Sequence, residues 1–343
     1  MICYHHTDAD GHSAAYNVLR GSKIVCVPDF FKPTNYGDKF DKHKDTDTVY
    51  IVDVSFTEPT YPDLINICKT ARRVYWIDHH QSSLDVIAAH KDELQKMKNL
   101  VYFVSKDYCG AALTYAFFKI KDNIMDRVIN RNIETDSYEI KTIYVNPKHN
   151  ELITVQVVVK GPTSSDYEMH NIEVQVPKWL RHIDDYDAWK KIYPETEKII
   201  NGFNCHEWNL VNDDKFNIDF WTKFTTEDNY ITNLFNMGKT ISMYNERRFN
   251  EELSATYELE YNGTKFLCKN GHGNSYNFAD KIYKYDAVIL YHFEGSIMKY
   301  LYSVYSSDAS SFDCKAFCEK FGGGGHFHAS GFSNEKSPLE LLK

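Results

Sequence analysis

The fold is decided by the stretch VYWIDHH at residues 74–80. Its first four residues are apolar, as in a buried strand, and an acid with two imidazoles follows at Asp78, His79 and His80. In open α/β folds, ligands bind at the edge formed by the carboxyl ends of the strands. The stretch therefore predicts a strand that carries these three side chains to a ligand-binding edge.

Two other expected strands end in side chains of the same kind. The first, at residues 2–4, opens into HHTDADG at residues 5–11, and another ends in Asp53. On its own, Asp10 could be a helix cap and Asp8 a surface turn residue. Three strands that bring acids to one edge favour a different interpretation, because clustered carboxylates repel one another unless cations neutralise them. Mixed carboxylate and imidazole ligands suit a pair of Mn²⁺ ions best, and Mg²⁺ or Co²⁺ less well.

Strand and helix patterns alternate over the first part of the chain, which predicts an α/β domain with a parallel sheet and helices on its faces. The expected strands are residues 2–4, 23–27, 48–53, 73–77 and 100–104, and the expected helices are residues 13–20, 62–70, 84–97 and 110–121. Residues 28–47 are interpreted as a polar loop. From residue 123 to residue 176 the pattern becomes β-type, which predicts a small β insertion before a helix at residues 177–191.

The rest of the chain predicts a second, smaller α/β domain. The first domain is expected to span residues 1–193, and a linker is expected at residues 194–226. A long amphipathic helix at residues 227–252 then opens the second domain, residues 227–343. The expected strands of this domain are residues 255–261, 264–268, 287–291 and 298–304, and a helix at residues 313–321 precedes a run of four glycines.

Two further stretches carry candidate functional residues. The first is HIDDYDAW at residues 182–189, whose acids are either plain helix-surface charges or the further acid that the metal pocket needs. The second is Gly322–Gly325 with His326 directly behind it, which is either a flexible surface loop or a loop that clamps a phosphate. Glycines leave backbone N–H groups bare for an anion, and the adjacent histidine favours the phosphate clamp.

Composition limits the classes of function. Of the 343 residues, 43% are hydrophobic, so a substantial core is expected. The formal net charge of -9 argues against a broad basic surface for long duplex nucleic acid, but not against a short nucleotide held by metal ions. No stretch approaches the roughly 20 apolar residues of a membrane span, and no signal peptide is visible. The 8 cysteines are scattered without a CxxC pair, so we expect reduced thiols and a cytoplasmic protein.

In these motifs and their order, the chain resembles the DHH phosphoesterase superfamily with its DHH-associated C-terminal domain. HTDADG at residues 6–11 resembles the first motif of that superfamily, Asp53 the second, and the triplet at residues 78–80 the third. The block GGGGHFHASGF at residues 322–332 resembles the GGGH element of the C-terminal domain. Many relatives carry a Ser-x-Arg-Ser step on the preceding strand. This chain has SVYS at residues 303–306, so the arginine that usually contacts the nucleotide is absent.

The resemblance implies the metal ligands. Asp53 is expected to bridge two Mn²⁺ ions. The remaining expected ligands are His6 and Asp8 for one ion, and Asp10, His79 and Asp185 for the other. His5 stays open as an alternative to His6, and Asp184 and Asp187 stay open as alternatives to Asp185.

The resemblance also implies catalytic and substrate-binding residues. Asp78 is expected to orient His79, and His80 and His326 are expected to contact the phosphate oxygens during catalysis. The expected substrate-binding residues are Gly322, Gly323, Gly324, Gly325, His326 and His328.

The superfamily includes RecJ-like exonucleases, nano-RNases, cyclic-dinucleotide phosphodiesterases and family II pyrophosphatases. The resemblance therefore implies a metal-dependent phosphodiesterase that hydrolyses short oligonucleotides or cyclic dinucleotides to nucleoside monophosphates, in a cleft between two domains. Two alternatives remain: a phosphomonoesterase or polyphosphate/pyrophosphate hydrolase, and a catalytically silent nucleotide-binding protein. We expect a small nucleotide or short oligonucleotide as the partner, with neither long duplex nucleic acid nor a membrane. A homodimer stays open.

Overall fold

The computed structural model describes residues 1–23, 30–35, 38–130, 152–160, 167–205, 216–252, 255–271, 284–307 and 309–342. The chain forms two compact units, Met1–Lys239 and Thr240–Lys343, and each is described here by itself. The strand expected at residues 23–27 lies, apart from Lys23, outside the described residues.

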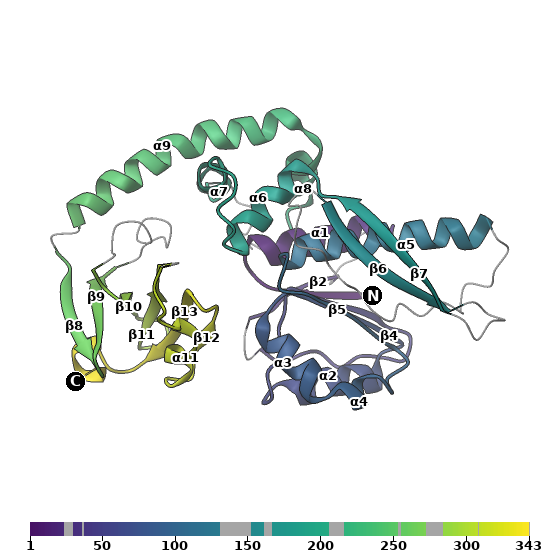
Figure 1. Cartoon of the computed structure of the whole chain (residues 1–343), viewed down its shortest axis with the longest axis horizontal. Coiled ribbons are helices and arrows are strands. Elements are labelled where there is room, and N and C mark those ends of the chain that lie inside the picture. Colours follow the sequence, from purple (N-terminus) through teal and green to yellow (C-terminus); the bar gives the residue numbers. More distant parts are fainter. Residues whose placement is uncertain are drawn as a thin grey trace. The chain divides into compact units, whose positions relative to one another are not determined.

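The first unit is built on a five-stranded sheet in the order β2-β1-β3-β4-β5 (Figure 1). Its strands are β1 (Ile2–His5), β2 (Phe31–Pro33), β3 (Thr48–Val52), β4 (Arg73–Asp78) and β5 (Leu100–Val104). Each pair of neighbouring strands is parallel, so the carboxyl ends of β1, β3 and β4 lie at the same edge. The predicted α/β class with a parallel sheet is confirmed.

Strand β2 lies within the stretch that was expected to be only a polar loop. It is short, and it pairs with β1 through the register Cys3 to Phe31. Phe30, just before it, is buried among the first unit's core residues. Two adjacent aromatic residues are enough to add an edge strand to a sheet whose next strand is apolar.

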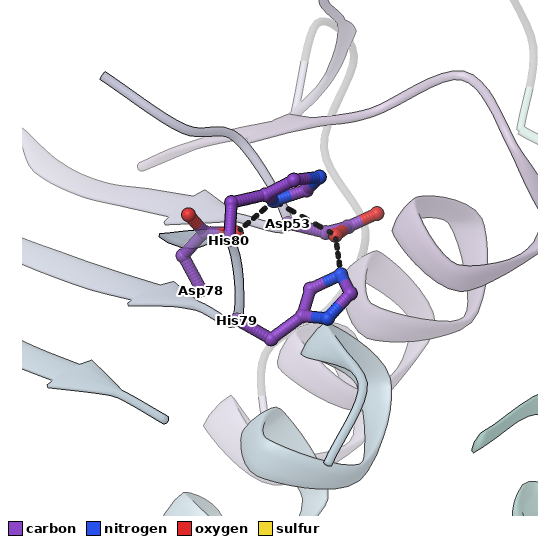
Figure 2. A group of neighbouring side chains, drawn as sticks. All are labelled: Asp53, Asp78, His79 and His80. Carbon is purple, nitrogen blue, oxygen red and sulfur yellow. Dashed lines mark hydrogen bonds and ion pairs between the residues drawn. The ribbon is translucent and has the colours of Figure 1, made fainter. Parts of the chain in front are cut away.

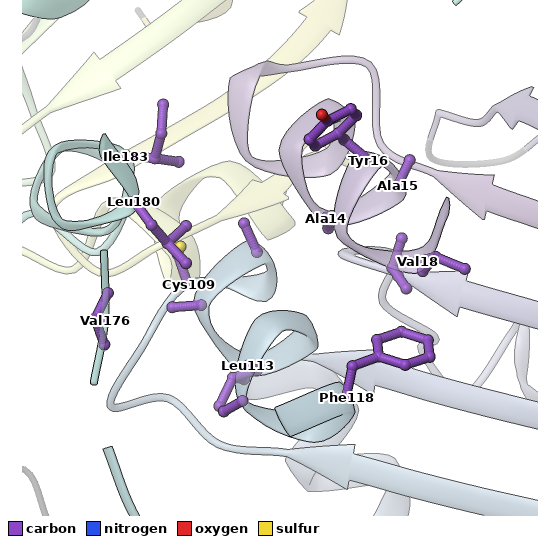
Figure 3. Close-up of a cluster of buried hydrophobic side chains, with 14 of the residues drawn as sticks. Ala14, Ala15, Tyr16, Val18, Cys109, Leu113, Phe118, Val176, Leu180 and Ile183 are labelled. Atoms are coloured by element: carbon purple, nitrogen blue, oxygen red, sulfur yellow. The ribbon is translucent and has the colours of Figure 1, made fainter. Parts of the chain in front are cut away.

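Helices cover both faces of this sheet because its strands are buried on both sides. Alternate residues of β3 belong to different cores: Tyr50 and Val52 pack with α1 (Ala9–Ser22) and α5 (Gly110–Asn130), whereas Val49 and Ile51 pack with α2 (Tyr61–Thr70). This alternation is the period of two that a β-strand imposes. Figure 3 shows side chains of α1 and α5, including Val18 and Phe118, in the first of these cores. The helix expected at residues 84–97 is two short ones, α3 (Gln81–Ala89) and α4 (Lys91–Leu94).

The insertion expected at residues 123–176 begins as the continuation of α5, which extends to Asn130. Residues 131–151 lie outside the described part of the chain. An antiparallel hairpin of β6 (Leu152–Lys160) and β7 (Tyr167–Gln175) follows, as the β-type pattern predicted. Ile153, Val155 and Ile172 are buried in the same core as α1 and α5, so the hairpin is part of the first unit's packing.

The stretch expected to be a linker carries two helices in its described part, α7 (Thr196–Phe203) and α8 (Ile218–Thr226). Phe203, Trp221 and Phe224 are buried in the core of the first unit, alongside residues of α6 (Lys178–Asp187). Aromatic side chains of this size contribute too much buried area to belong to a solvated connection. The division between the two units lies at residue 239, inside the long helix α9 (Asp228–Glu252).

The second unit holds a six-stranded mixed sheet in the order β12-β13-β11-β10-β9-β8. Its elements are β8 (Tyr257–Tyr261), β9 (Thr264–Asn270), β10 (Ala287–Glu294), β11 (Lys299–Tyr305), α11 (Cys314–Glu319), β12 (Gly324–Gly325), β13 (Ala329–Asn334) and α12 (Pro338–Leu341). Phe317 of α11 packs with Phe266 and Phe332 of the sheet. The predicted smaller α/β domain is confirmed. Among the described helices of the whole chain, none combines the length and apolar character needed to cross a membrane.

Candidate metal centre

The first acid of the cluster caps a helix and contacts an imidazole. Asp8 is the N-cap of α1, and its Oδ1 accepts a hydrogen bond of 2.9 Å from the backbone N–H of Gly11. Its other oxygen, Oδ2, lies 2.8 Å from Nδ1 of His6. Nδ1 of His6 is also 3.9 Å from Oδ2 of Asp53. The helix cap that the sequence suggested for Asp10 is thus formed by Asp8, and the second oxygen of Asp8 still faces the cluster.

Asp10 is held by the start of a helix 100 residues further along the chain. Its Oδ2 accepts from the backbone N–H of Gly110 at 2.7 Å, and its Oδ1 accepts from that of Ala111 at 2.8 Å. The N-terminus of α5 thus stabilises a carboxylate that is only 1% exposed. Burial, and next the charge of Asp8, still raise the pKa of Asp10 to about 6.

Asp53 lies in the middle of the cluster (Figure 2). Directly after β3 the backbone turns in the left-handed region, with φ of 55° at Asp53. Oδ1 of Asp53 is 3.2 Å from Nε2 of His79, whereas Oδ2 faces Nδ1 of His6. Neither oxygen accepts a hydrogen bond from the described residues, although the side chain is buried. Burial, followed by the charges of Asp10 and Asp8, raises the pKa of Asp53 well above its ordinary value.

The triplet after β4 divides into two parts (Figure 2). Oδ1 of Asp78 lies 2.8 Å from Nδ1 of His80, and Oδ2 accepts a hydrogen bond from the hydroxyl of Ser83. Asp78 thus orients His80 and not His79, which was the expected partner. Burial opposes ionisation of Asp78, but the adjacent His80 outweighs it and holds the pKa of Asp78 below its ordinary range. Nε2 of His79 instead faces the carboxylates of Asp53 and Asp10, at 3.2 and 3.7 Å.

The acid that α6 brings to the cluster is Asp187. Its Oδ2 lies 3.3 Å from Nε2 of His79, and burial followed by the charge of Asp10 raises its pKa well above the ordinary value. Asp185, the residue expected from the sequence, instead accepts hydrogen bonds from the backbone N–H groups of Ile192 and Tyr193, at 2.6 and 3.3 Å. We therefore replace Asp185 by Asp187 in the proposed ligand set.

Asp184, the other alternative, contacts residues next to the cluster. Its Oδ1 accepts from the backbone N–H of Cys109 at 2.8 Å, and its Oδ2 lies 2.7 Å from Nζ of Lys190. Cys109 immediately precedes the N–H groups that hold Asp10. His5, the alternative to His6, is fully buried, and its Nδ1 lies 2.8 Å from the carbonyl oxygen of His6. It packs against His12 and lies outside the candidate ligand groups.

The donor atoms suit divalent cations. Three groups of described residues bring their ligand atoms within 4.8 Å of one another: Asp53 with Asp78, His79 and His80; His6 with Asp8 and Asp53; and Asp10 with His79 and Asp187. Within these groups the pKa values of Asp10, Asp53 and Asp187 are raised, and the oxygens of Asp53 accept no hydrogen bond from the described residues. Carboxylates buried in this way are stable as anions only if a cation neutralises them. The residues present therefore fit the metal that the sequence predicted.

The glycine segment of the second unit is well formed. Gly322 and Gly325 have φ of 80° and 142°, which only glycine adopts readily, and Gly324–Gly325 forms β12 against β13. His326 is exposed at the turn, where its N–H donates to the carbonyl of Ala329 at 2.7 Å. Nδ1 of His328 lies 2.9 Å from Oγ of Ser306. Ser306 is the last residue of the step that lacks the arginine of many relatives.

Sequence reasoning missed two contributors to the cluster: the backbone at Gly110 and Ala111, and the hydroxyl of Ser83. Asp187 was among its open alternatives. Ser83 lies five residues after Asp78, on the helix that follows the triplet. A polar residue on the first turn of a helix after a metal motif is a signal that could have been used.

No family model of known proteins matches the chain. The chain is 24% identical over 241 residues to the uncharacterized protein R106 of Acanthamoeba polyphaga mimivirus, and the match covers 66% of this chain and 54% of that protein. The chain thus spans about half the length of this curated relative.

Three solved structures resemble the chain over 99% of its length. They are the pGpG-specific phosphodiesterase PggH of Vibrio cholerae (12% identity, 95% of that chain, TM-score 0.34), CDC45 of Entamoeba histolytica (10%, 93%, 0.42) and RecJ of Thermus thermophilus in complex with Mn²⁺ (12%, 50%, 0.48). All three are DHH-superfamily proteins, the superfamily that the motifs of this chain resemble. Because each TM-score is below 0.5, we base the proposals below on the residues of this chain.

Gly110 leaves room for the side chains of Asp10 and Asp53, so replacing Gly110 with alanine should weaken metal binding. A Cβ at this position would lie 2.7 Å from Cβ of Asp53 and 3.0 Å from Oδ2 of Asp10, so both carboxylates would have to move. We expect the affinity for Mn²⁺, measured by calorimetric titration, to fall by about 10–100-fold, as for other losses of support around a metal. The matched control is Gly295→Ala, where a Cβ meets nothing within 4 Å. Unchanged affinity in Gly110→Ala would contradict the proposed set.

Proposed function

We propose that the chain is a metal-dependent phosphoesterase of the DHH type that hydrolyses short phosphodiesters. The observation that carries this proposal is the placement of Asp53. Its two buried oxygens face two different groups of candidate ligands, one around His6 and one around His79, and neither oxygen is satisfied by a hydrogen bond among the described residues. A carboxylate in this position is suited to bridge two cations.

Two Mn²⁺ ions are the proposed cofactor, with Mg²⁺ or Co²⁺ as possible substitutes. His6, Asp8 and Asp53 would hold one ion, and Asp10, Asp53, His79 and Asp187 would hold the other. When bound, such ions supply Lewis acidity and the positive charge that a phosphoryl group needs in order to react.

The chain's own residues would position the substrate. The contacts of Asp78 with Ser83 and His80 fix the orientation of the His80 ring through Nδ1. We assign the opposite edge of this ring, at Nε2, to a phosphate oxygen of the substrate. The charge of Asp78 opposes the effect of burial and raises the pKa of His80, which favours the protonated, anion-binding form.

The second unit is proposed to bind the rest of the substrate. The exposed turn that ends at His326 offers an imidazole suited to a phosphate. The backbone N–H groups of Gly322, Gly323 and His326 donate to the carbonyls of Glu319, Cys318 and Ala329, so they are not the bare donors that the sequence predicted. His328, held by Ser306, would support this turn. The absence of an arginine at residues 303–306 leaves the imidazole of His326 as the proposed phosphate contact. We also propose a cytoplasmic location, which the cysteine pattern favours.

The substrate is proposed to be short, and a length series tests both activity and preference. With Mn²⁺ present, we expect a linear dinucleotide or a cyclic dinucleotide to be hydrolysed at least tenfold faster than a single strand of about 20 nucleotides, because a chain of net charge -9 attracts a long polyanion weakly. Strands of that length exceed the roughly 4–16 nucleotide footprint of dedicated single-strand binders. Added chelator should stop all hydrolysis.

Three results would change the proposal. Equal rates on the dinucleotide and the long strand would support a processive exonuclease. Hydrolysis of pyrophosphate or of nucleoside monophosphates, but of no dinucleotide, would support the alternative of a pyrophosphatase or phosphomonoesterase. Nucleotide binding without hydrolysis of any of these compounds in Mn²⁺ would support the catalytically silent alternative.

A further inference from the structure

The first unit has a hollow whose lining residues are not part of the proposed metal centre. It is a cavity of about 380 Å³ between α1, α5, the start of α6 and the end of α8. Its wall includes Tyr16, Arg20, Lys23, Tyr115, Lys119 and Trp179. None of the candidate metal ligands lines it.

The wall of this cavity is positively charged. It holds the cations Arg20, Lys23 and Lys119, and Asp122 is the one carboxylate among the described residues that line it. Asp122 pairs with Lys23 at 3.2 Å. Among the described residues, no carboxylate pairs with Arg20 or Lys119. Three cations against one acid leave a local excess of two positive charges on a chain whose formal net charge is -9. Such an excess favours an anionic ligand.

Arg20 is held in place by an aromatic residue of the same wall. Its Nη1 donates to the hydroxyl of Tyr16 at 3.3 Å, and that hydroxyl lies 3.2 Å from Oγ1 of Thr222 on α8. A guanidinium has five N–H donors in a fixed fork, so one contact orients the group and leaves others for a ligand. Nζ of Lys119 lies 5.5 Å from the ring centre of Tyr115, which places a second cation beside an aromatic face.

The remaining wall is aromatic. Tyr16, Tyr115, Phe118 and Trp179 all line the cavity, and the first and third of these are labelled in Figure 3. Tyr16, Phe118 and Trp179 are buried in the core of the first unit, whereas Tyr115 is only partly buried and offers the more accessible ring. Such a ring can stack on a planar ligand, and the bases of nucleotides are planar ligands that also carry phosphate. A volume of about 380 Å³ lies near the lower end of the roughly 300–1,000 Å³ of ligand sites, which suits one nucleotide better than two.

We propose that this cavity is a second binding site, for a nucleoside monophosphate, with the phosphate held by Arg20 and Lys119 and the base packed on the ring of Tyr115. The assignment goes beyond the proposed phosphoesterase activity and does not depend on it. Its ligand class includes the products of that activity. Helices α1 and α5 both start at the metal cluster and both pass this cavity, so a ligand here contacts the two helices that position Asp10.

Binding is tested in the full-length Asp53→Asn variant with chelator present, so that the metal centre can neither bind metal nor turn over ligand. The probe is adenosine monophosphate, measured by calorimetry and by quenching of tryptophan fluorescence. We expect saturable binding at a single site. Arg20→Ala and Lys119→Ala should each weaken it by at least tenfold, as expected for loss of a charge-assisted hydrogen bond. Lys69→Ala, an exposed lysine at the end of α2, is the matched control and should leave binding unchanged.

Two further probes separate the parts of the ligand. Adenosine without phosphate, and inorganic phosphate without a base, should each bind at least tenfold more weakly than the monophosphate. Both replaced side chains are exposed, so thermal unfolding of the variants should match that of the parent protein. Absence of saturable binding, or equal binding in Arg20→Ala, Lys119→Ala and the control, would overturn the proposal without bearing on the phosphoesterase activity.

Discussion

Replacing Asp53 with asparagine is expected to abolish hydrolysis and, at the same time, to make the metal-free protein more stable. Asp53 faces both groups of candidate ligands, so its loss should cost more than the roughly 10–100-fold typical of residues that only support a metal ligand. We expect a fall in kcat/KM on the order of 10³ or more, since both proposed ions depend on this carboxylate. Elemental analysis should show fewer than two Mn²⁺ ions per chain.

The gain in stability follows from the raised pKa of Asp53, which burial and the charges of Asp10 and Asp8 cause. A carboxyl group whose pKa rises on folding favours the folded state when protonated, and this contribution is lost as the pH rises through the folded-state pKa. At neutral pH an ionised Asp53 therefore opposes folding of the metal-free protein. The melting temperature of Asp53→Asn in chelator should exceed that of the parent at neutral pH, and the difference should vanish in acid.

Asparagine is the appropriate replacement because Asp53 has φ of 55°. Asparagine tolerates the left-handed region, whereas alanine there costs about 1 kcal/mol or more and would hide the gain. The control is Asp45→Asn, an exposed acid outside the cluster, which should leave both activity and melting temperature unchanged. Two bound ions with near-normal hydrolysis in Asp53→Asn would disprove the bridging role. A lower melting temperature of Asp53→Asn than of the parent in chelator would disprove the proposed charge repulsion at Asp53.

The pair Asp187→Asn and Asp185→Asn should separate a metal ligand from a structural residue on the same helix. Asp187 lies 3.3 Å from His79, so Asp187→Asn should lower kcat/KM by roughly 10²–10³ and weaken binding of one of the two ions. Asp185 accepts from the backbone N–H groups of Ile192 and Tyr193. Its replacement should cost about 1 kcal/mol of unfolding free energy, with metal content unchanged.

The two variants should change different measurements, so each variant serves as the control for the other. Metal content should depend on residue 187, and the unfolding free energy in chelator should fall only for the change at residue 185. If Asp185→Asn strips an ion and Asp187→Asn does not, the ligand expected from the sequence is the correct one, and the α6 region changes conformation when metal binds.

The sequence predicted the sheet edge because its signals are local. An apolar run followed by an acid or imidazole marks the end of a buried strand, and parallel strands bring such ends together whatever the intervening segments do. Asp53 and His79 could therefore be placed in one cluster without knowledge of the helices. The parallel order of β1, β3 and β4 then completes the arrangement.

The choice between Asp185 and Asp187 was beyond such reasoning. Successive residues of a helix point about 100° apart, so the rotation of α6 decides which acid faces His79. That rotation is set by buried residues such as Leu180 and Ile183, which contact a core assembled from many segments. The helices α7 and α8 were missed for a related reason, because polar residues around Pro194 suggested a solvated linker, whereas Trp221 and Phe224 are buried in the core of the first unit.

The bond from Asp10 to the start of α5 also has a consequence for synthesis of the protein. A chain emerging from the ribosome shows its first motif early, but Asp10 cannot reach its two backbone donors until Gly110 and Ala111 have emerged. Asp187 arrives later still, after the whole β6–β7 hairpin. A nascent or prematurely terminated chain that stops before residue 187 would therefore leave this ligand set incomplete. We infer that the group of Asp10, His79 and Asp187 is completed only after residue 187 has emerged, whereas the residues of the group His6, Asp8 and Asp53 emerge much earlier.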